Sequence, residues 1–260
     1  MTRGMQDKVA LVTGGASGIG RVTAQAFAQE GVKVIVATDA NIQGAEETVR
    51  LIKDTGGEAT FIKCDVSKAL EVEAMVNKGV ETYGSLDYAF NNAGIGPDGK
   101  RIPVFPIADC PEEIWDRMLD VNLKGVWLCM KYEIRQMVTQ KRGVIVNTSS
   151  VGALRPIPGF GPYAASKGGL IVLTKTAALE CAPFGIRVNV ICPGLTARTQ
   201  LADNISGANP EEREQMLKAV PMARMGEPEE IAEAVLWLCS DSASFITGHV
   251  MPIDGGLAAT

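Results

Sequence analysis

Short, continuous apolar runs alternate with longer amphipathic stretches along the whole chain. The apolar runs are rich in β-branched residues and fall at residues 9–12, 32–37, 59–62, 86–90, 144–147, 187–191 and 249–253. Such runs are typical of parallel strands buried on both faces of a sheet. Helical periodicity covers the intervening residues 18–29, 43–55, 68–83, 111–139, 162–182 and 228–239. The pattern predicts a single α/β domain over residues 1–260, with a doubly wound parallel sheet.

Two stretches break this rhythm. Residues 94–106 hold three glycines and three prolines and are expected to form a loop, and residues 195–220 are a helix-prone insertion after the sixth strand. In a doubly wound sheet, the loops after the carboxyl ends of the strands line the binding crevice. We therefore expect both stretches to border a site, with residues 195–220 as a lid over the substrate.

A glycine-rich turn follows the first predicted strand and opens the first helix. Gly14 suits a tight turn, and Gly18 and Gly20 would let a pyrophosphate approach backbone N–H groups at the helix N-terminus. Ser17 and Ile19 lie between these glycines and join them as candidate cofactor contacts. The strand–turn–helix context makes this a predicted dinucleotide site.

Residues at the ends of the next strands fit the same cofactor. Asp39 can accept hydrogen bonds from ribose hydroxyls and would repel a 2′-phosphate, and no Arg or Lys lies at 15–17 or 37–41. This favours NAD over NADP. Further along, Asp65 and Val66 are placed to meet the adenine, and small residues after the fourth strand would let the backbone pass close to the cofactor. That last group is Asn92, Ala93 and Gly94.

Tyr163 has a lysine four residues later, Lys167, which a helix places on the same face. An ammonium beside a phenol favours the phenolate, so we expect Lys167 to lower the pKa of Tyr163 and let it exchange a proton near neutral pH. Ser150 lies thirteen residues upstream, at the end of an apolar run. With the glycine-rich turn, these residues predict a hydride-transfer enzyme.

Composition narrows the alternatives. The 260 residues are 46% hydrophobic and carry a net charge of −5 without any basic run, so we expect no nucleic-acid partner. No apolar stretch approaches the roughly 18 residues of a membrane span, so no membrane partner is expected. The N-terminal segment has no signal-peptide pattern, which favours the cytoplasm.

The cysteines and histidines argue against other chemistries. The six cysteines are scattered without a Cys-x-x-Cys pair, which is typical of reduced, buried thiols in a cytosolic protein. His249 is the single histidine, so we expect no metal site, and a Ser-His-Asp hydrolase is disfavoured because His249 would have to serve alone.

Taken in order, these segments resemble the short-chain dehydrogenase/reductase family over nearly the whole chain. The matching segments are residues 13–20, 65–66, 91–94, Asn122, Ser150, 163–167, Pro193-Gly194 and 253–256. The resemblance implies a Rossmann-type single domain, a nicotinamide cofactor and a catalytic tetrad of Asn122, Ser150, Tyr163 and Lys167. It also implies a homotetramer built through helices within residues 115–139 and 162–182, with the C-terminal tail as a second interface.

Two segments depart from the family pattern. The acidic residue that NAD-using members carry after the second strand would fall at Thr38, and Asp39 is one residue further. Either neighbour disfavours a 2′-phosphate. The segment after Pro193 and Gly194 is one residue longer than usual, so Thr196 or Thr199 could hold the nicotinamide amide, with a slight preference for Thr196.

The resemblance implies that Tyr163 exchanges the substrate proton, Lys167 binds the nicotinamide ribose, Ser150 holds the substrate oxygen and Asn122 holds a relay water near Lys167. The expected pocket combines Ile95-Gly96, residues 151–160 and the lid, and Arg155 is its one obvious charge. We therefore expect an NAD(H)-dependent oxidoreductase for a secondary alcohol, alicyclic alcohols included, and its ketone. The alternatives are an NADPH-dependent 3-oxoacyl-(acyl-carrier-protein) reductase and a non-catalytic nucleotide sensor.

Overall fold

A seven-stranded, fully parallel sheet forms the centre of the protein, in the order β3-β2-β1-β4-β5-β6-β7. The computed structural model describes residues 4–97, 102–199 and 210–260. The strand order reverses between β1 and β4, which is the switch point where doubly wound sheets bind ligands. The strands are β1 Val9–Thr13, β2 Lys33–Thr38, β3 Ala59–Lys63, β4 Tyr88–Asn91, β5 Gly143–Thr148, β6 Ile186–Pro193 and β7 Val250–Ile253.

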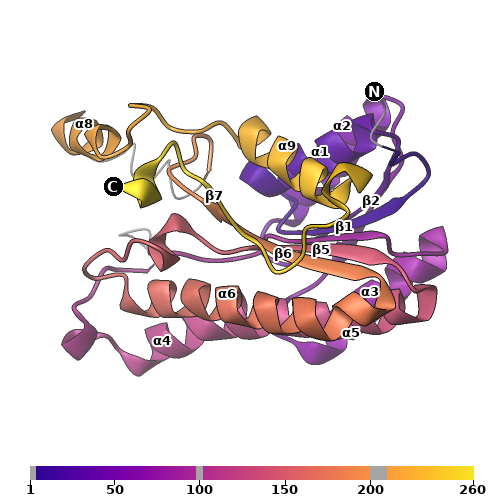
Figure 1. Ribbon diagram of the computed structural model, residues 1–260, viewed down its shortest axis with the longest axis horizontal. Coiled ribbons are helices and arrows are strands. Elements are labelled where there is room, and N and C mark those ends of the chain that lie inside the picture. Colours follow the sequence, from indigo (N-terminus) through magenta and orange to yellow (C-terminus); the bar gives the residue numbers. More distant parts are fainter. Residues whose placement is uncertain (1–3, 98–101, 200–209) are drawn as a thin grey trace.

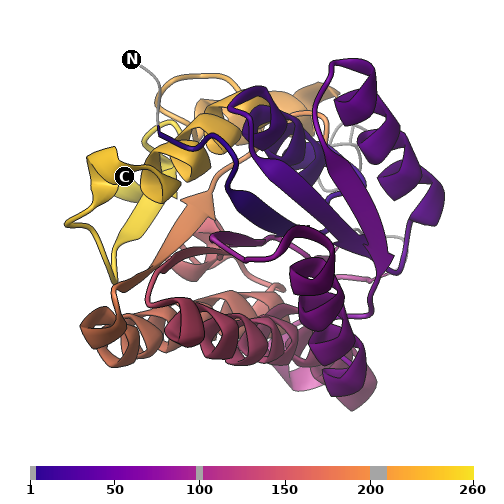
Figure 2. The ribbon, with the colours of Figure 1, turned by 90° about the vertical axis from the view of Figure 1, so that its right-hand side faces the viewer.

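Helices cover both faces of this sheet, as Figures 1 and 2 show. One layer holds α1 (Gly18–Gln29), α2 (Ile42–Asp54) and α9 (Pro228–Cys239), and the other holds α3 (Ala69–Tyr83), α4 (Glu112–Leu119), α5 (Gly125–Gln140) and α6 (Gly161–Cys181). The short helix α8 (Pro210–Lys218) lies at the edge, near the C-terminus. The predicted doubly wound fold in one domain is therefore confirmed.

Two hydrophobic cores lie on the two sides of the sheet, because successive strand side chains point to opposite faces. Val34 and Val36 of β2 join the core under α1 and α9, whereas Ile35 joins the core under α3, α5 and α6. This burial on both faces is the physical reason for the continuous apolar runs. Among the described residues, no helix is long and apolar enough to cross a membrane.

The predicted helix over residues 111–139 is interrupted in the structure. A π-helical turn, Asp120–Lys124, joins α4 to α5 and contains the buried Asn122. The Asn122 side chain forms hydrogen bonds to Ile95 in the loop after β4. π-Turns within helices are frequent at functional sites. Part of the predicted lid, residues 200–209, lies outside the described residues.

Candidate active site

The glycine-rich turn forms a cradle with no room for side chains. Gly14 has φ +67°, and a Cβ on it would lie 2.9 Å from Ala93 Cα. A Cβ on Gly20 would collide with the Gly14 carbonyl oxygen, and Gly18 has φ +51°, which favours glycine. Ser17 is exposed at the N-cap of α1 and makes no capping bond through its side chain, while Ile19 packs on the core. The cradle therefore leaves backbone N–H groups open at a helix N-terminus.

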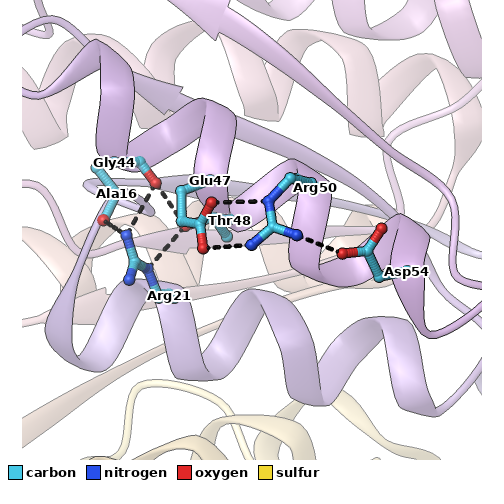
Figure 3. Close-up of polar contacts among 7 residues, drawn as sticks. All are labelled: Ala16, Arg21, Gly44, Glu47, Thr48, Arg50 and Asp54. Atoms are coloured by element: carbon cyan, nitrogen blue, oxygen red, sulfur yellow. Dashed lines mark hydrogen bonds and ion pairs between the residues drawn. The ribbon is translucent and has the colours of Figure 1, made fainter.

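Arg21 fixes this turn from behind, which sequence reasoning did not predict. Figure 3 shows its guanidinium between the turn and α2. Nη2 donates to the carbonyl oxygens of Ala16 at 2.7 Å and Gly44 at 3.0 Å, and Nε donates to Thr48 Oγ1 at 3.0 Å. The Thr48 hydroxyl in turn donates to Gly15 O. Because the carbonyl oxygens of Gly15 and Ala16 are held by Thr48 and Arg21, the backbone of the turn is fixed in place.

The loop after β4 passes directly against the turn and the tetrad. The backbone N–H groups of Asn92 and Ala93 both donate to Thr13 Oγ1 at 3.1 Å. Gly94 is exposed, and a Cβ there would lie 3.1 Å from Asn122 Oδ1 and 3.3 Å from Lys167 Nζ. The structure thus brings the predicted residues 92–94 between the glycine cradle and the tetrad.

The ends of β2 and β3 place the remaining predicted adenosine contacts. β2 ends at the buried Thr38, and Asp39 is the first exposed residue beyond it. Val66 is buried, whereas Asp65 Oδ1 already accepts bonds from the backbone N–H and hydroxyl of Ser67. Of the two candidates after β2, Asp39 is therefore the one that presents a side chain to solvent.

Ser150, Tyr163 and Lys167 converge at the carboxyl end of β5 and the start of α6. The Ser150 hydroxyl accepts from the Gly152 N–H at 3.0 Å and also hydrogen-bonds the Tyr163 phenol. Lys167 is 4% exposed and donates from Nζ to Thr148 O at 2.8 Å. Its Nζ lies 5.9 Å from the centre of the Tyr163 ring. The spacing prediction for these three residues agrees with this geometry.

Burial dominates the electrostatics of this group. It lowers the pKa of Lys167 to about 8 and raises the pKa of Tyr163, the bond from Ser150 only partly opposing that rise. In the protein alone the net shift of the Tyr163 pKa is therefore upward, and the lowering expected from Lys167 does not set its direction. The low-dielectric surroundings disfavour the phenolate more than the neighbouring groups favour it.

The Asn122 side chain is bonded to the loop after β4. Its Oδ1 accepts from Ile95 N–H at 2.8 Å, and its Nδ2 donates to Ile95 O at 2.8 Å. Nδ2 also lies 3.2 Å from the hydroxyl of Ser166. Both ends of the amide are thus engaged with protein groups, which holds the loop after β4 over the tetrad.

The chain after β6 contributes the last predicted contacts. Gly194 lies against the C-terminal tail, where a Cβ would be 2.7 Å from Asp254 Cα. Thr196 is buried and donates to Gly194 O at 3.2 Å, and Thr199 donates to Thr196 O at 2.8 Å. Pro193 ends β6 and pairs with Ile253. Arg198 forms ion pairs with Glu227 and Glu229 at the start of α9.

The space around Tyr163 is apolar. Phe160 meets its ring edge-on, with the ring centres 6.3 Å apart, and Phe160 also bridges to Phe105 of the loop after β4. The ring borders a small pocket that includes Ile114 and Met118 of α4, which sequence reasoning had not assigned. Within the described ranges, no group of three or more His, Cys, Asp or Glu residues could hold a metal ion.

Known proteins resemble this chain along its whole length. A family model described as enoyl-(acyl carrier protein) reductase matches residues 14–258. An uncharacterized oxidoreductase of Thermotoga maritima is 44% identical over 98% of both chains. A cyclohexanol dehydrogenase of Acinetobacter sp. is 40% identical over 98% of this chain and 96% of its own. A 3-oxoacyl-(acyl-carrier-protein) reductase of Staphylococcus aureus is also 40% identical, over 96% of this chain and 98% of its own.

Solved structures give the same result. Levodione reductase superimposes with a TM-score of 0.92 at 36% identity, covering 98% of this chain and 99% of that chain. NAD⁺-bound xylitol dehydrogenase superimposes with a TM-score of 0.89 at 35% identity, covering 97% and 100%. From the sequence match, the fold and the shared architecture, the chain belongs to the short-chain dehydrogenase/reductase family of oxidoreductases.

Proposed function

We propose that the protein is an NAD(H)-dependent oxidoreductase that interconverts a secondary alcohol, alicyclic alcohols included, and its ketone. The observation that carries this proposal is the meeting of Ser150, Tyr163 and Lys167 with a glycine cradle at the switch point of the sheet. The similarity to a cyclohexanol dehydrogenase supports the substrate class.

The turn suits a dinucleotide because Gly14 and Gly20 let the backbone pack tightly against Ala93 and against the turn itself, directly before the N-terminus of α1, where a pyrophosphate could bind. The exposed Asp39 carboxylate would bind the adenosine ribose and repel a 2′-phosphate, and the NAD⁺-bound xylitol dehydrogenase supports NAD as the cofactor. The remaining contacts in this proposal are Ser17, Gly18, Ile19, Thr38, Asp65, Val66, Asn92, Ala93, Gly94, Pro193, Gly194, Thr196, Tyr163 and Lys167.

When bound, the nicotinamide supplies or accepts a hydride at the carbinol carbon. In alcohol oxidation the Tyr163 oxygen removes the hydroxyl proton, and in ketone reduction it returns that proton. Since burial raises the pKa of Tyr163 in the free protein, the positive charge of an oxidised nicotinamide would be needed to favour the phenolate. Ser150 would donate to the substrate oxygen, and Asn122 holds the loop that closes over Lys167.

The proposed assembly is a homotetramer. An apolar groove along α4, α5 and α6 is lined by Leu119, Leu123, Trp127 and Val172 among others. Trp127 is 45% and Val172 65% exposed in the single chain, which a twofold partner would cover. The free cysteines, five of the six buried, support a reducing, cytoplasmic location.

The test offers NAD⁺ and NADP⁺ in parallel to the protein with cyclic and linear secondary alcohols. The rate of cofactor reduction is measured from the absorbance of the reduced nicotinamide. We expect turnover with NAD⁺ and at least one secondary alcohol. Absence of turnover with every alcohol and both cofactors contradicts the proposal.

A second candidate is an NADPH-dependent 3-oxoacyl-(acyl-carrier-protein) reductase, which the relative from Staphylococcus aureus and the description of the family model favour. This candidate predicts that the protein oxidises NADPH in the presence of acetoacetyl thioesters. It also predicts that this rate exceeds the rate of NAD⁺ reduction with every alcohol in the panel. The exposed Asp39 beside the end of β2 weighs against it. Hydride transfer with any substrate excludes the non-catalytic sensor.

A further inference from the structure

Two glycines flank the Tyr163 ring on opposite edges. A Cβ on Gly96 would lie 3.4 Å from Tyr163 Cε2 and 3.7 Å from Cδ2, and among the described residues other than its chain neighbours nothing else lies within 4 Å of it. A Cβ on Gly152 would lie 3.6 Å from Tyr163 Cε1 and 3.4 Å from Ser150 Oγ. Each glycine therefore borders the space in which a substrate oxygen would meet Tyr163 and Ser150.

Neither glycine is required by the backbone. Gly96 and Gly152 are both absent from the glycines with positive φ, so an alanine could adopt either conformation without strain. The distances for an added Cβ are ordinary van der Waals distances, so a methyl group would fit against the tyrosine without displacing it. What a methyl group would remove is free space beside the reacting atoms.

Beyond Ser150 and the exposed Arg155, the side chains of the neighbouring loop are mostly apolar. Phe160 stands edge-on to the Tyr163 ring, and Leu154 and Ile157 of the same loop are 38% and 51% exposed. A substrate with an apolar carbon skeleton would gain the most binding free energy from burial against these side chains. Space on both edges of the tyrosine accommodates a carbinol carbon with bulk on both sides, as in a ring.

We propose that Gly96 and Gly152 are specificity-determining residues that form a slot for a neutral alicyclic alcohol or ketone. The inference rests on the proposed oxidoreductase function. The slot admits a ring because Gly96 and Gly152 place no side chain of their own against the two edges of Tyr163, and a methyl on either glycine narrows it. A small acyclic alcohol such as 2-propanol needs less of this space and is affected less.

The experiment compares kcat/KM for cyclohexanol and for 2-propanol, with NAD⁺, in the wild-type protein and in Gly96→Ala and Gly152→Ala. We expect each substitution to lower the value for cyclohexanol about tenfold or more and that for 2-propanol less than about threefold, since one methyl in an apolar pocket is worth about 10–200-fold. The control is Gly168→Ala on the same helix as Tyr163, where, apart from the adjacent backbone of that helix, an added Cβ meets no atom of the described residues within 4 Å.

The outcomes separate the slot from the function. Wild-type protein that oxidises neither alcohol, nor any other in the panel, refutes the proposed function and with it the slot. Wild-type protein that oxidises 2-propanol in preference to cyclohexanol overturns the slot alone, and so does an equal loss for both alcohols in the alanine variants. If Gly96→Ala and Gly152→Ala have the same Tm and the same affinity for NAD⁺ as Gly168→Ala, their loss of kcat/KM reflects poorer substrate fit and not impaired folding.

Discussion

Glu133 on α5 is a carboxyl group without access to water, and its replacement by glutamine should stabilise the protein at neutral pH. Its side chain is 0% exposed, and its Oε2 accepts from Asn91 Nδ2 at 2.9 Å. The same Nδ2 reaches Asn147 Oδ1 at 3.1 Å, so the group joins α5 to β4 and β5 below the active site. Within the described residues, Glu133 Oε1 has no hydrogen-bond partner.

Burial raises the pKa of Glu133 to about 8, although the bond from Asn91 opposes this. In the unfolded chain the carboxyl titrates near its ordinary value of 4.5. Between these two values the unfolded chain releases the proton and the folded chain keeps it, so the free energy of unfolding falls as the pH rises. Between pH 5 and pH 7 the loss amounts to about 2–3 kcal/mol.

Glutamine at this position cannot ionise, so Glu133→Gln escapes this loss. We expect the free energy of unfolding of the variant, relative to that of the wild type, to grow by about 2–3 kcal/mol between pH 5 and pH 7. For a chain of this size that corresponds to a gain of about 5–10 °C in the difference between the two Tm values. Differential scanning calorimetry at both pH values and one protein concentration measures it.

The control is Glu81→Gln, which changes a 67%-exposed carboxylate paired with Lys78 on α3. Its effect on Tm should differ by less than about 1 °C between the two pH values, because solvent screens such a pair. The reasoning is refuted if the Tm of Glu133→Gln minus that of the wild type is the same at pH 5 and pH 7, or is smaller at pH 7.

Two further substitutions test the cofactor site. Arg21→Met removes the bonds to Ala16 O and Gly44 O, and we expect the Kd for NAD⁺ to rise about tenfold by calorimetric titration, a loss of about 1.4 kcal/mol. Arg50→Met is its control, because that guanidinium pairs only with exposed carboxylates on α2 among the bonds drawn in Figure 3, and an equal effect there would contradict the role of Arg21. Asp39→Ala should raise the ratio of kcat/KM for NADP⁺ to that for NAD⁺ by about tenfold or more. An unchanged ratio would show that Asp39 does not read the ribose.

The sheet could be predicted because its inner strands are buried on both faces and so appear as unbroken apolar runs. The end of β2 illustrates the limit of this signal. Thr38 and Asp39 are adjacent in sequence, and only the structure shows that one is buried and the other exposed. Burial of a single residue at a strand end depends on the neighbouring strand, which local sequence does not specify.

The parts of the site that sequence missed depend on contacts between distant segments. Helical periodicity through residues 111–139 gives no sign of the π-turn at Asn122, because the bonds of its side chain to Ile95 span 27 residues. Arg21 follows the predicted turn directly, yet its partner Gly44 belongs to the next helix. The raised pKa of Tyr163 likewise reflects burial by several elements, which the Tyr-x-x-x-Lys spacing could not reveal.

The role of Tyr163 is tested most directly by the steady-state rate of cyclohexanol oxidation at saturating NAD⁺, in wild type and in Tyr163→Phe. Calorimetric titration with NAD⁺ first establishes that both proteins bind the cofactor within about threefold of each other, since the phenol hydroxyl is one among many proposed cofactor contacts and its loss should weaken binding only slightly. The proposed chemistry predicts a kcat lower by about 10²–10⁴ in Tyr163→Phe. A kcat within about tenfold of wild type would contradict Tyr163 as the group that exchanges the substrate proton.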